Sequence, residues 1–532
     1  MSGRRVYHCG VVGADDRKTY LWITPEYRAT RTQPLLWNSL RVSHGTCNFR
    51  WGLVLKQGPM RGVSVWAYRE RPSGHLFPGV GDGIHEVAPL ATEGKVMRPP
   101  FVVSLLAVAL LAVAFAALPS SEAPTGFDNQ SNGMVDDATH QADQVKFDEV
   151  ENVSDGLGPL YNAQSCRECH QSPVSGGGSQ VAELRVGHEG AHHRFENAEI
   201  PIARGTEIIT GRTLVNDRAI CPNGAFPNTE IQERLPDSEN VRTTRLSLSL
   251  LGDGFVEAVA DQTFIELARK QCKETHHKIC GQAIFVPILE APGQTGVGRF
   301  GWKDQHASLL SFSGDAYLNE MGITTRLFPD EVTKLCNTAS EPNDVPDPDG
   351  LDDLDHFARF IRATKAPARD GQLAATPQTR RGSELFEKVG CATCHVRALT
   401  TAPAGTKING GKFTISDALG AKTFHPYSDF LMHNVGTGDG IVVPMLEHYG
   451  RRMYQTTWRN FSGEDFHNAR FKVRTAPLWS VRLRSRLMHD GASVTLRDAV
   501  TRHGGEASEV MHHFEKLSHA DQEAILEFLR SL

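Results

Sequence analysis

The sequence predicts a mainly α-helical protein with two domains and long connecting loops. Residues 118–532 number about 415, which is more than one hydrophobic core normally serves. A five-residue motif, Cys-x-x-Cys-His, occurs twice, at 166–170 and at 391–395, so each copy can organise one domain. Apolar residues at helical spacing precede the second motif, and glycine-rich stretches such as Ser175–Ser179 connect the elements.

Both copies of the motif predict covalently attached haem. In the attachment signature of c-type haem, the two thiols add to the vinyl groups of the porphyrin and the histidine ligates the iron. Zinc sites and dithiol redox pairs also use Cys-x-x-Cys, but neither requires a histidine directly after the second cysteine in both copies. We therefore expect two haem c groups, held by Cys166, Cys169 and His170 and by Cys391, Cys394 and His395.

The first 96 residues are expected to lie outside both domains. They contain four of the seven tryptophans and show no sustained helical or strand periodicity. Our hypothesis is that this segment is upstream sequence translated from a wrongly assigned start, with Met97 as the natural first residue. An N-terminal cytoplasmic extension is the alternative.

A secretory signal peptide is expected at residues 97–117. Met97-Arg98 supplies a positive start, Phe101–Leu118 is apolar except for Ser104, and Ala114-Phe115-Ala116 fits a cleavage site. A membrane anchor is the alternative, because about 18 apolar residues is also the lower limit for spanning a bilayer. The alanine-rich composition favours cleavage, so we expect a periplasmic protein.

The charge balance argues against a nucleic-acid partner. Residues 117–532 retain 42 of the 56 basic and 55 of the 62 acidic residues, a net charge of about −13. Nucleic-acid binding needs a basic face. An acidic surface suits a basic donor protein, because complementary charges steer encounter, although a merely solvated acidic surface explains the balance equally well.

Four cysteines remain outside the two motifs and the first 96 residues. An even number in an oxidising compartment predicts up to two disulfides. Three pairings can be drawn and the sequence does not choose between them; Cys272–Cys280 together with Cys221–Cys336 is our working guess. The pair His276-His277 lies inside the short loop and could indicate a metal, but a solvated loop is the simpler interpretation.

Helices can be placed between and beside two linkers. The linkers are the proline- and aspartate-rich stretch Glu341–Leu351 and the segment Ala366–Thr376, and Asp352–Ala363 between them is predicted to be helical. We place the domain boundary in the second linker. The expected domains are an N-terminal haem domain, 118–375, and a C-terminal one, 376–532.

Two further helices are expected in the C-terminal domain. Gly382–Gly390 has apolar residues at helical spacing and leads directly into Cys391. The chain ends on another helix, for which Ser518 is the expected N-cap with Asp521 three residues later. Helices next to the attachment motif are usual in small cytochrome domains, so we expect two cytochrome c-like haem domains.

Seven short segments of the chain match a known family: Gly158–Ala163, Gly301–Lys303, Glu320–Thr324, Tyr427–Leu431, Pro477–Trp479, His489–Gly491 and His503–Ala507. Through them, residues 145–532 resemble the di-haem oxidoreductase family. These proteins are related to the bacterial di-haem cytochrome c peroxidases and to the di-haem enzyme that matures the methylamine dehydrogenase cofactor. The resemblance implies two cytochrome c-like domains, in which one haem reacts with peroxide while the other passes electrons from a small donor protein, such as a c-type cytochrome or a cupredoxin.

The resemblance assigns two catalytic residues. In the peroxidases a tryptophan lies between the haems and a glutamate stands over the reactive iron about twenty residues later. Here Trp302 and Glu320 follow in the same order, so we expect an electron relay and a distal acid/base. One departure is Phe312, which stands where the peroxidases have a glutamine; it removes a hydrogen-bond donor and could favour another oxidant.

The resemblance also implies His503 as the second iron ligand of the C-terminal haem. It lies 14 residues after His489, where the peroxidases have methionine and the maturation enzyme has tyrosine. A His395/His503 pair stabilises ferric iron and lowers the reduction potential relative to a His/Met pair. His489 would then lie near a haem propionate.

Two points stay open at the sequence level. The sixth ligand of the first haem could be His188, His192 or His193, or none of these. Calcium occurs between the domains of the peroxidases, but clustered cations in the corresponding segment make a bound calcium doubtful here; they are Arg482, Arg484 and Arg486.

Three functions are compatible with these residues. The first is a periplasmic di-haem peroxidase or oxidase, with the haem at 166–170 reactive towards hydrogen peroxide or another oxidant. The second is a non-catalytic di-haem electron-transfer cytochrome. The third is an oxidase that acts on a protein or polymer, like the maturation enzyme or the di-haem rubber oxygenases. The sequence does not give the oligomeric state.

Overall fold

The computed structural model describes residues 120–190, 193–336, 345–442 and 469–532, together with five strands between residues 7 and 70. The chain divides into two compact units, Met1–Val102 and Val103–Leu532. The predicted signal peptide, 97–117, lies outside the described residues. None of the helices in the described part of the chain combines the length and hydrophobicity needed to cross a bilayer.

The first unit contains one antiparallel sheet, whose strands pair in sequence order. The hypothesis that residues 1–96 are translated upstream sequence stays a prediction. The strands are β1 (Tyr7–Gly10), β2 (Tyr20–Glu26), β3 (Trp37–Ser43), β4 (Arg50–Gln57) and β5 (Val63–Glu70).

The second unit holds both motifs and mixes helices with many small sheets. Its α-helices are α2 (Asp137–Asp148), α3 (Cys166–Cys169), α4 (Asn228–Ile231), α5 (Asp253–Glu257), α6 (Asp261–Glu274), α7 (Leu309–Met321), α8 (Asp353–Ala363), α9 (Gly371–Ala374), α10 (Pro377–Val389), α13 (Leu496–Thr501), α14 (Ser508–Glu515) and α15 (His519–Arg530). Its strands are β6 (Ser121–Glu122), β7 (Leu160–Tyr161), β8 (Ala182–Glu189), β9 (Phe195–Asn197), β10 (Ile200–Ile202), β11 (Glu207–Ile209), β12 (Leu214–Val215), β13 (Arg218–Ala219), β14 (Val241–Leu246), β15 (Phe285–Pro287), β16 (Thr295–Val297), β17 (Leu399–Thr400), β18 (Lys407–Ile408), β19 (Phe413–Thr414), β20 (Lys422–Phe424), β21 (Met432–His433) and β22 (Val473–Arg474).

The predicted mainly α-helical class is wrong. Helix makes up 33% and strand 16% of the structure, spread over many small sheets. The segments that we expected to be loops fold back on themselves as pairs of short strands, such as β10 with β11 and β15 with β16. Strands of two or three residues are too short for an alternating pattern to show in a sequence, so periodicity missed them.

The largest sheet of the second unit has the order β12-β8-β14, with β9 also pairing with β8. Strands β8 and β14 are antiparallel, and their register sets Glu183 opposite Arg245 and Ala182 opposite Leu246. Because side chains alternate across a strand, Glu183 and Arg185 point to the same face. This sheet therefore brings three charged side chains close to the first motif.

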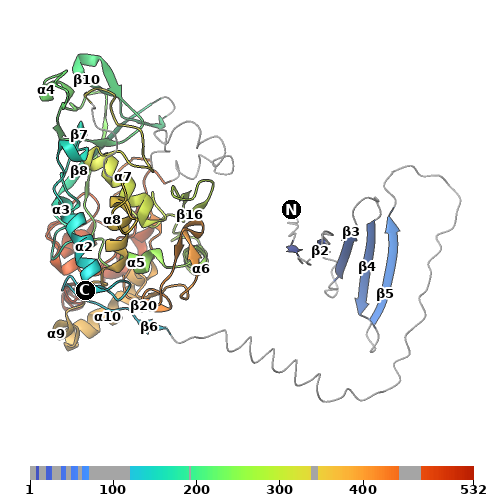
Figure 1. Ribbon diagram of the computed structural model, residues 1–532. Helices are drawn as coiled ribbons and strands as arrows, with labels where there is room; N and C mark the ends of the chain where they lie inside the picture. Colours follow the sequence, from blue (N-terminus) through green and yellow to red (C-terminus); the bar gives the residue numbers. More distant parts are fainter. Residues whose placement is uncertain are drawn as a thin grey trace. The chain divides into compact units, whose positions relative to one another are not determined.

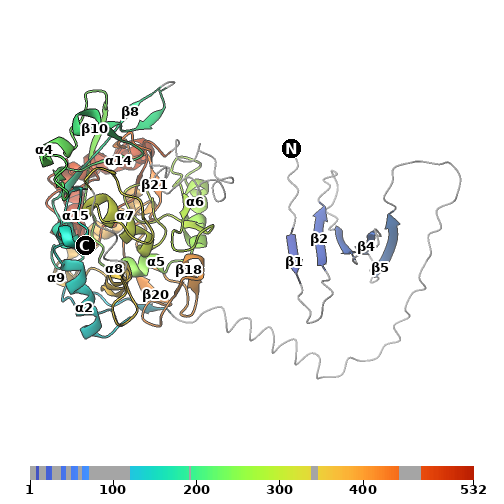
Figure 2. The same ribbon diagram turned by 45° about the horizontal axis from the view of Figure 1, so that its top comes forward.

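Helices α7 and α8 lie side by side in the middle of the second unit in both views (Figure 1, Figure 2). They pack in a large apolar core that contains Phe147 and Phe360 together with Phe424 and Trp479. Residues from both predicted domains thus share one core. A second core is drawn wholly from residues 385–532. The domain boundary near residue 375 stays a prediction.

The three helices predicted from local signals are confirmed. Helix α8 has Asp352 as its N-cap, and α15 begins after Ser518, whose side chain accepts a hydrogen bond from the backbone N–H of Asp521. Helix α10 begins earlier than predicted, because Thr376 caps it and a proline occupies its first position. The predicted linker Ala366–Thr376 contains the short helix α9.

The guessed disulfide arrangement is confirmed. The two bridges are Cys221–Cys336 and Cys272–Cys280, with sequence separations of 115 and 8 residues. The long bridge ties the end of the segment after α7 to the region of β13. The short bridge closes the loop after α6.

The two bridges should differ in their effect on stability. A cross-link lowers the conformational entropy of the unfolded chain and so raises the free energy of unfolding, by more when it closes a longer loop. The expected contribution to this free energy is roughly 5 kcal/mol for the long bridge and roughly 3 kcal/mol for the short one. The double variant Cys221→Ser/Cys336→Ser should therefore unfold at a lower temperature than Cys272→Ser/Cys280→Ser in calorimetry. Equal melting temperatures would contradict this ranking.

Candidate functional site

The first motif forms the short helix α3 and the residue that ends it. Ser165 caps the helix by accepting from the backbone N–H of Glu168, and His170 is the C-terminal cap residue. The Nδ1–H of His170 donates to the carbonyl oxygen of Leu248 at 2.9 Å. This hydrogen bond fixes the ring and leaves Nε2 available for a metal.

A cavity opens beside this motif, and we call it the first cavity. Its walls come from α3, the β8–β14 sheet, the loop around Trp302, and helices α7 and α8. Among the described residues that line it, His170 is the only imidazole. Its lining includes Cys166, Cys169, His170, Glu183, Arg185, Arg245, Leu246, Trp302, Gln305, Phe312 and Glu320.

The second motif follows α10 without a break. Gly390 ends that helix in a left-handed conformation (φ 105°), which glycine adopts without strain, and Cys391–Thr393 form one 3₁₀ turn. The Nδ1–H of His395 donates to the carbonyl oxygen of Tyr427 at 2.9 Å. The second motif therefore repeats the arrangement of the first.

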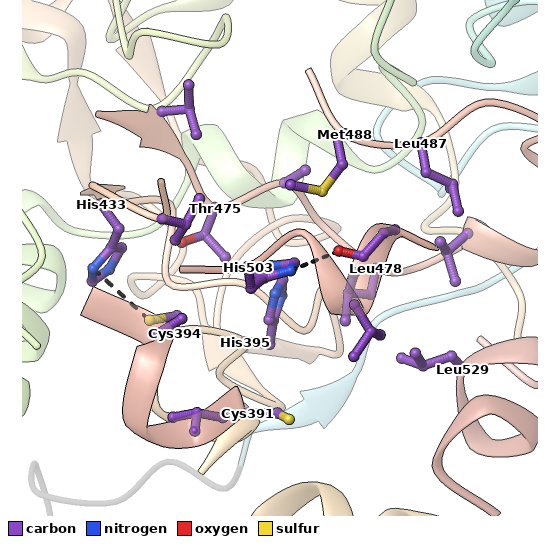
Figure 3. A pocket seen from close by; sticks show the side chains of 18 of the residues that line it. Cys391, Cys394, His395, His433, Thr475, Leu478, Leu487, Met488, His503 and Leu529 are labelled. Carbon is purple, nitrogen blue, oxygen red and sulfur yellow. Dashed lines mark hydrogen bonds between the residues drawn. The ribbon is translucent and has the colours of Figure 1, made fainter. Parts of the chain in front are cut away.

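Another cavity, which we call the second cavity, opens beside the second motif; its described lining includes Trp302, Cys391, Cys394, His395, Arg474, Arg484, His489 and His503. His503 faces His395 across the second cavity. Their ring centres lie 6.4 Å apart, and the Nδ1–H of His503 donates to the carbonyl oxygen of Ala499 at 2.8 Å. Two imidazoles that bind one metal from opposite sides place their ring centres about 6 Å apart, because each nitrogen lies about 2 Å from the metal. Figure 3 shows both rings in the cavity, with the sulfurs of Cys391 and Cys394 nearby. The spacing fits the predicted ligand pair.

The cysteines of both motifs fit attached haem better than the alternatives. None of the four forms a disulfide. Burial raises the pKa of Cys166 and of Cys391 to about 12, so neither is a thiolate at neutral pH. Zinc sites and redox dithiols depend on thiolates stabilised by nearby positive charge. A thioether carries no charge and suits these surroundings.

Other groups in the two cavities also fit haem. Burial lowers the pKa of His395 to about 4 and lowers that of His170 and His503, so the three rings are neutral, as metal binding requires. The Nδ1 atom of His489 is buried without a hydrogen-bond partner among the described residues. Haem propionates need cationic and hydrogen-bonding partners, and the arginines that line the cavities are Arg185 and Arg245 in the first and Arg474 and Arg484 in the second.

Trp302 lines both cavities. Only 7% of this residue is exposed, and its Nε1–H donates to the carbonyl oxygen of Leu246 at 2.8 Å. The backbone N–H of Leu246 in turn donates to the carbonyl oxygen of His489 at 2.8 Å, and the ring of His489 lies edge-on to the indole. The expected relay residue thus forms part of the wall between the cavities.

Glu320 lies near the end of α7 and lines the first cavity, as the resemblance implies. Its Oε2 accepts from the Nδ2 of Asn162 at 3.1 Å, and its Oε1 lies 3.5 Å from the Nη2 of Arg185. Burial and then the negative charge of Glu183 raise the pKa of Glu320 well above its usual range. Both effects favour the protonated form of the carboxyl. Sequence reasoning missed Asn162, Glu183 and Arg185, because they lie more than 130 residues away in the chain.

Phe312 also lines the first cavity and stacks on Phe300, with ring centres 6.0 Å apart. It leaves an apolar surface where a glutamine was expected. A different amide, Gln305, lines the same cavity. Gln305 lies seven residues before Phe312, so counting residues from Trp302, as in the peroxidases, did not identify it.

His188 does not reach either cavity. Its Nδ1 lies 3.1 Å from Glu239 and its Nε2 lies 3.4 Å from Glu196. His193 is exposed and lies beside Glu189, and His192 lies outside the described residues. No described histidine therefore faces His170 across the first cavity.

The three arginines near the expected calcium site bind backbone carbonyls. Arg484 donates to the carbonyl oxygen of Ser247, Arg482 to that of Leu532 and Arg486 to that of Gly491. These contacts use the arginines to join loops. The expectation that these cations make a bound calcium between the domains doubtful stays untested.

A profile of the family described as "Di-haem oxidoreductase, putative peroxidase" matches residues 222–532. The chain belongs to this di-haem oxidoreductase family. Its cofactors are therefore haems, and the match covers Trp302, Glu320, the second motif and His503. The first motif, at 166–170, precedes the matched region.

The other comparisons add little to the family assignment. A search of curated proteins found no significant match. A structure of Kuenenia stuttgartiensis hydrazine synthase, pressurised with 20 bar xenon, is similar with a TM-score of 0.33 and 13% identity over 87% of this chain and 100% of that chain. A likeness this weak carries no argument about fold or function.

The geometry of the second cavity predicts the effect of removing one histidine. His503→Ala should turn the second haem from a six-coordinate low-spin centre into a five-coordinate or water-ligated one, because the imidazole that faces His395 is then lost. The absorption spectrum of the ferric protein reports this change. His512→Ala, on the exposed face of α14, is the matched control and should leave the spectrum unchanged. An unaltered low-spin spectrum in His503→Ala would refute the ligand assignment.

Proposed function

We propose that this di-haem oxidoreductase is a periplasmic c-type peroxidase. It takes electrons from a small donor protein, such as a c-type cytochrome or a cupredoxin, and reduces hydrogen peroxide or a related small oxidant. Both haems are attached through the cysteines of the two motifs. Export by the segment at 97–117 belongs to the same proposal, because covalent haem attachment and two disulfides suit an oxidising compartment.

One observation carries the proposal. The first cavity joins His170 to Glu320, a partly buried carboxyl whose raised pKa favours its protonated form, and shares Trp302 as a wall with the second cavity. A peroxidase needs a reactive site, a proton-transfer group beside it and a route for electrons. These three requirements meet at this place in the chain.

The chain's own groups perform the acid–base part of the reaction. When bound, a haem held by His170 would supply the redox chemistry at this cavity. Glu320, whose raised pKa favours its protonated form, would donate a proton to the peroxide oxygen that leaves as water. Asn162 orients the carboxyl, and Phe312 keeps that side of the cavity apolar.

Trp302 provides the route between the haems. The indole touches both cavities and its Nε1–H is fixed to a backbone carbonyl, so the ring cannot turn away. The His395/His503 pair, with both coordination positions filled, suits electron transfer and not oxidant binding. We therefore assign relay to the second haem and reaction to the first.

The first cavity favours catalysis over a plain electron-transfer cytochrome. Such a cytochrome fills both positions of each iron with strong ligands, and the described residues set no second histidine opposite His170. Oxidation of a protein or polymer is the remaining alternative. Turnover with reduced donor cytochrome and peroxide alone distinguishes it, because a polymer oxidase needs its polymer.

Peroxide should react with the ferric protein quickly, and Glu320→Gln should slow that step by a factor of about 10²–10⁴. The amide has no acidic proton to donate. Stopped-flow absorption after mixing with peroxide measures the rate. The rate in the native protein should fall as the pH rises through the raised pKa of Glu320, because only the protonated carboxyl can donate.

The control is Glu515→Gln on the exposed face of α14, which should react like the native protein. An equal loss of the rate of reaction with peroxide in Glu320→Gln and Glu515→Gln would show that the effect is not specific to the cavity. No reaction of the native protein with peroxide at any pH would exclude the peroxidase function itself.

A further inference from the structure

A third cavity, which we call the polar cavity, adjoins the first cavity. It has a volume of about 600 Å³ and is lined by charged and amide side chains from α3, β8 and β13, including Arg167, Glu168, Asp217 and Arg218. Four residues line both cavities: Ser165, Cys169, Glu183 and Glu320. A polar space of this size holds several waters. The boundary between water and the reactive cavity is therefore formed in large part by two carboxylic acids.

Arg185 connects these two acids. Its Nε donates to the Oε2 of Glu183 at 2.9 Å, and its Nη2 contacts the same oxygen and lies 3.5 Å from the Oε1 of Glu320. Glu183 and Glu320 are 23% and 17% exposed in their side chains, and both face the two cavities. One guanidinium thus holds two carboxyl groups side by side.

The strand geometry fixes this arrangement. Glu183 and Arg185 are two residues apart on β8, so both side chains lie on the face of the sheet that borders the cavities. Arg245 lies opposite Glu183 on β14, but its charge is already paired with Asp439 at 2.8 Å. Arg185 is therefore the cation that serves the carboxyl pair.

The two acids have different affinities for a proton. Burial raises the pKa of Glu183, but the charge of Arg185 outweighs it and the net shift is downward. Glu320 has the opposite shift, because burial and the charge of Glu183 both disfavour its ionised form. Two carboxyls held this closely hold one proton between them at neutral pH. The other charged groups at the pair and around the two cavities are Asp148 on α2, Arg167 and Glu168 on α3, Arg245 on β14, Asp315 on α7, and Asp217 and Arg218 at the polar cavity.

We propose that Glu183 and Glu320 act as one acid–base unit that carries protons from the polar cavity to the first haem cavity, with Arg185 as the positioning residue. This inference rests on the proposed function. Reduction of one hydrogen peroxide to two waters consumes two electrons, supplied by the donor protein, and two protons, which must come from solvent. Glu320 can donate only one proton before it has to be supplied with another.

The relay balances in two steps. When Glu320 gives its proton to the outer oxygen, it becomes an anion, and Glu183 then accepts a proton from water in the polar cavity. Glu183 passes that proton to Glu320 and returns to its ionised state beside Arg185. One carboxyl is protonated and one is ionised before and after each cycle.

Removing the negative charge of Glu183 and removing the positive charge of Arg185 should shift the pH midpoint of the carboxyl titration in opposite directions. Glu183→Gln removes the negative charge beside Glu320 and should lower the pH midpoint of the remaining carboxyl by about one unit or more. Arg185→Gln removes the positive charge and should raise it. The probe is the C=O stretching band of a protonated carboxyl in infrared spectra of the resting ferric holoprotein, followed through pH and shifted by D₂O.

The control is Glu189→Gln on the same strand β8, which lines neither cavity and should leave the band and the peroxide reaction unchanged. Glu183→Asp and Arg185→Lys keep the charges and should restore most of the native midpoint, which separates a charge effect from misfolding. Shifts in the same direction for Glu183→Gln and Arg185→Gln, or no shift in either, would overturn the proposal.

Turnover gives an independent test of the relay. In Glu183→Gln, proton supply should become slow enough that steady-state turnover with peroxide shows a larger solvent isotope effect than the native protein, while the first contact with peroxide stays fast. An unchanged isotope effect would overturn the relay. The infrared titration needs no peroxide, so it can fail or succeed whether or not peroxide is the substrate.

Discussion

The wall that separates the two cavities is the constraint on which the account of function depends. Trp302 belongs to both cavities, and hydrogen bonds fix it to Leu246, which is itself fixed to the segment of His489. Leu246 is the last residue of β14, the strand that pairs with β8. The β8–β14 sheet, which carries Glu183 and Arg185, and the indole of Trp302 are thus held in one framework. Under the proposed function, a shift of this strand would alter proton supply and electron transfer together.

The two motifs show how the backbone prepares a metal site before the metal is bound. In each one, a carbonyl oxygen accepts from Nδ1 of the histidine, which selects the tautomer with Nε2 as the ligand atom. Burial keeps these rings neutral. The difference between the cavities lies on the opposite side, where one offers His503 and the other offers Glu320. This difference is the basis on which we propose a relay site and a reactive site.

The sequence was informative where chemistry is local. The attachment motifs, the capped helices α8, α10 and α15, and the order of Trp302, Glu320 and His503 could all be predicted from short segments. The strand content could not, because pairs of two or three residues leave no periodic pattern, and the predicted mainly α-helical class failed for that reason. Arg185 and Glu183 could not be found either. Their role depends on the register of β8 against β14 and on the approach of α7, which is set by packing between residues far apart in the chain.

The most direct test of the account is the electron paramagnetic resonance spectrum of the ferric protein. We expect two haem signals of equal intensity, one low-spin from the iron between His395 and His503 and one high-spin from the iron bound by His170 alone. Two low-spin signals would mean that both irons carry two strong ligands, and the division into a reactive and a relay haem would then be contradicted.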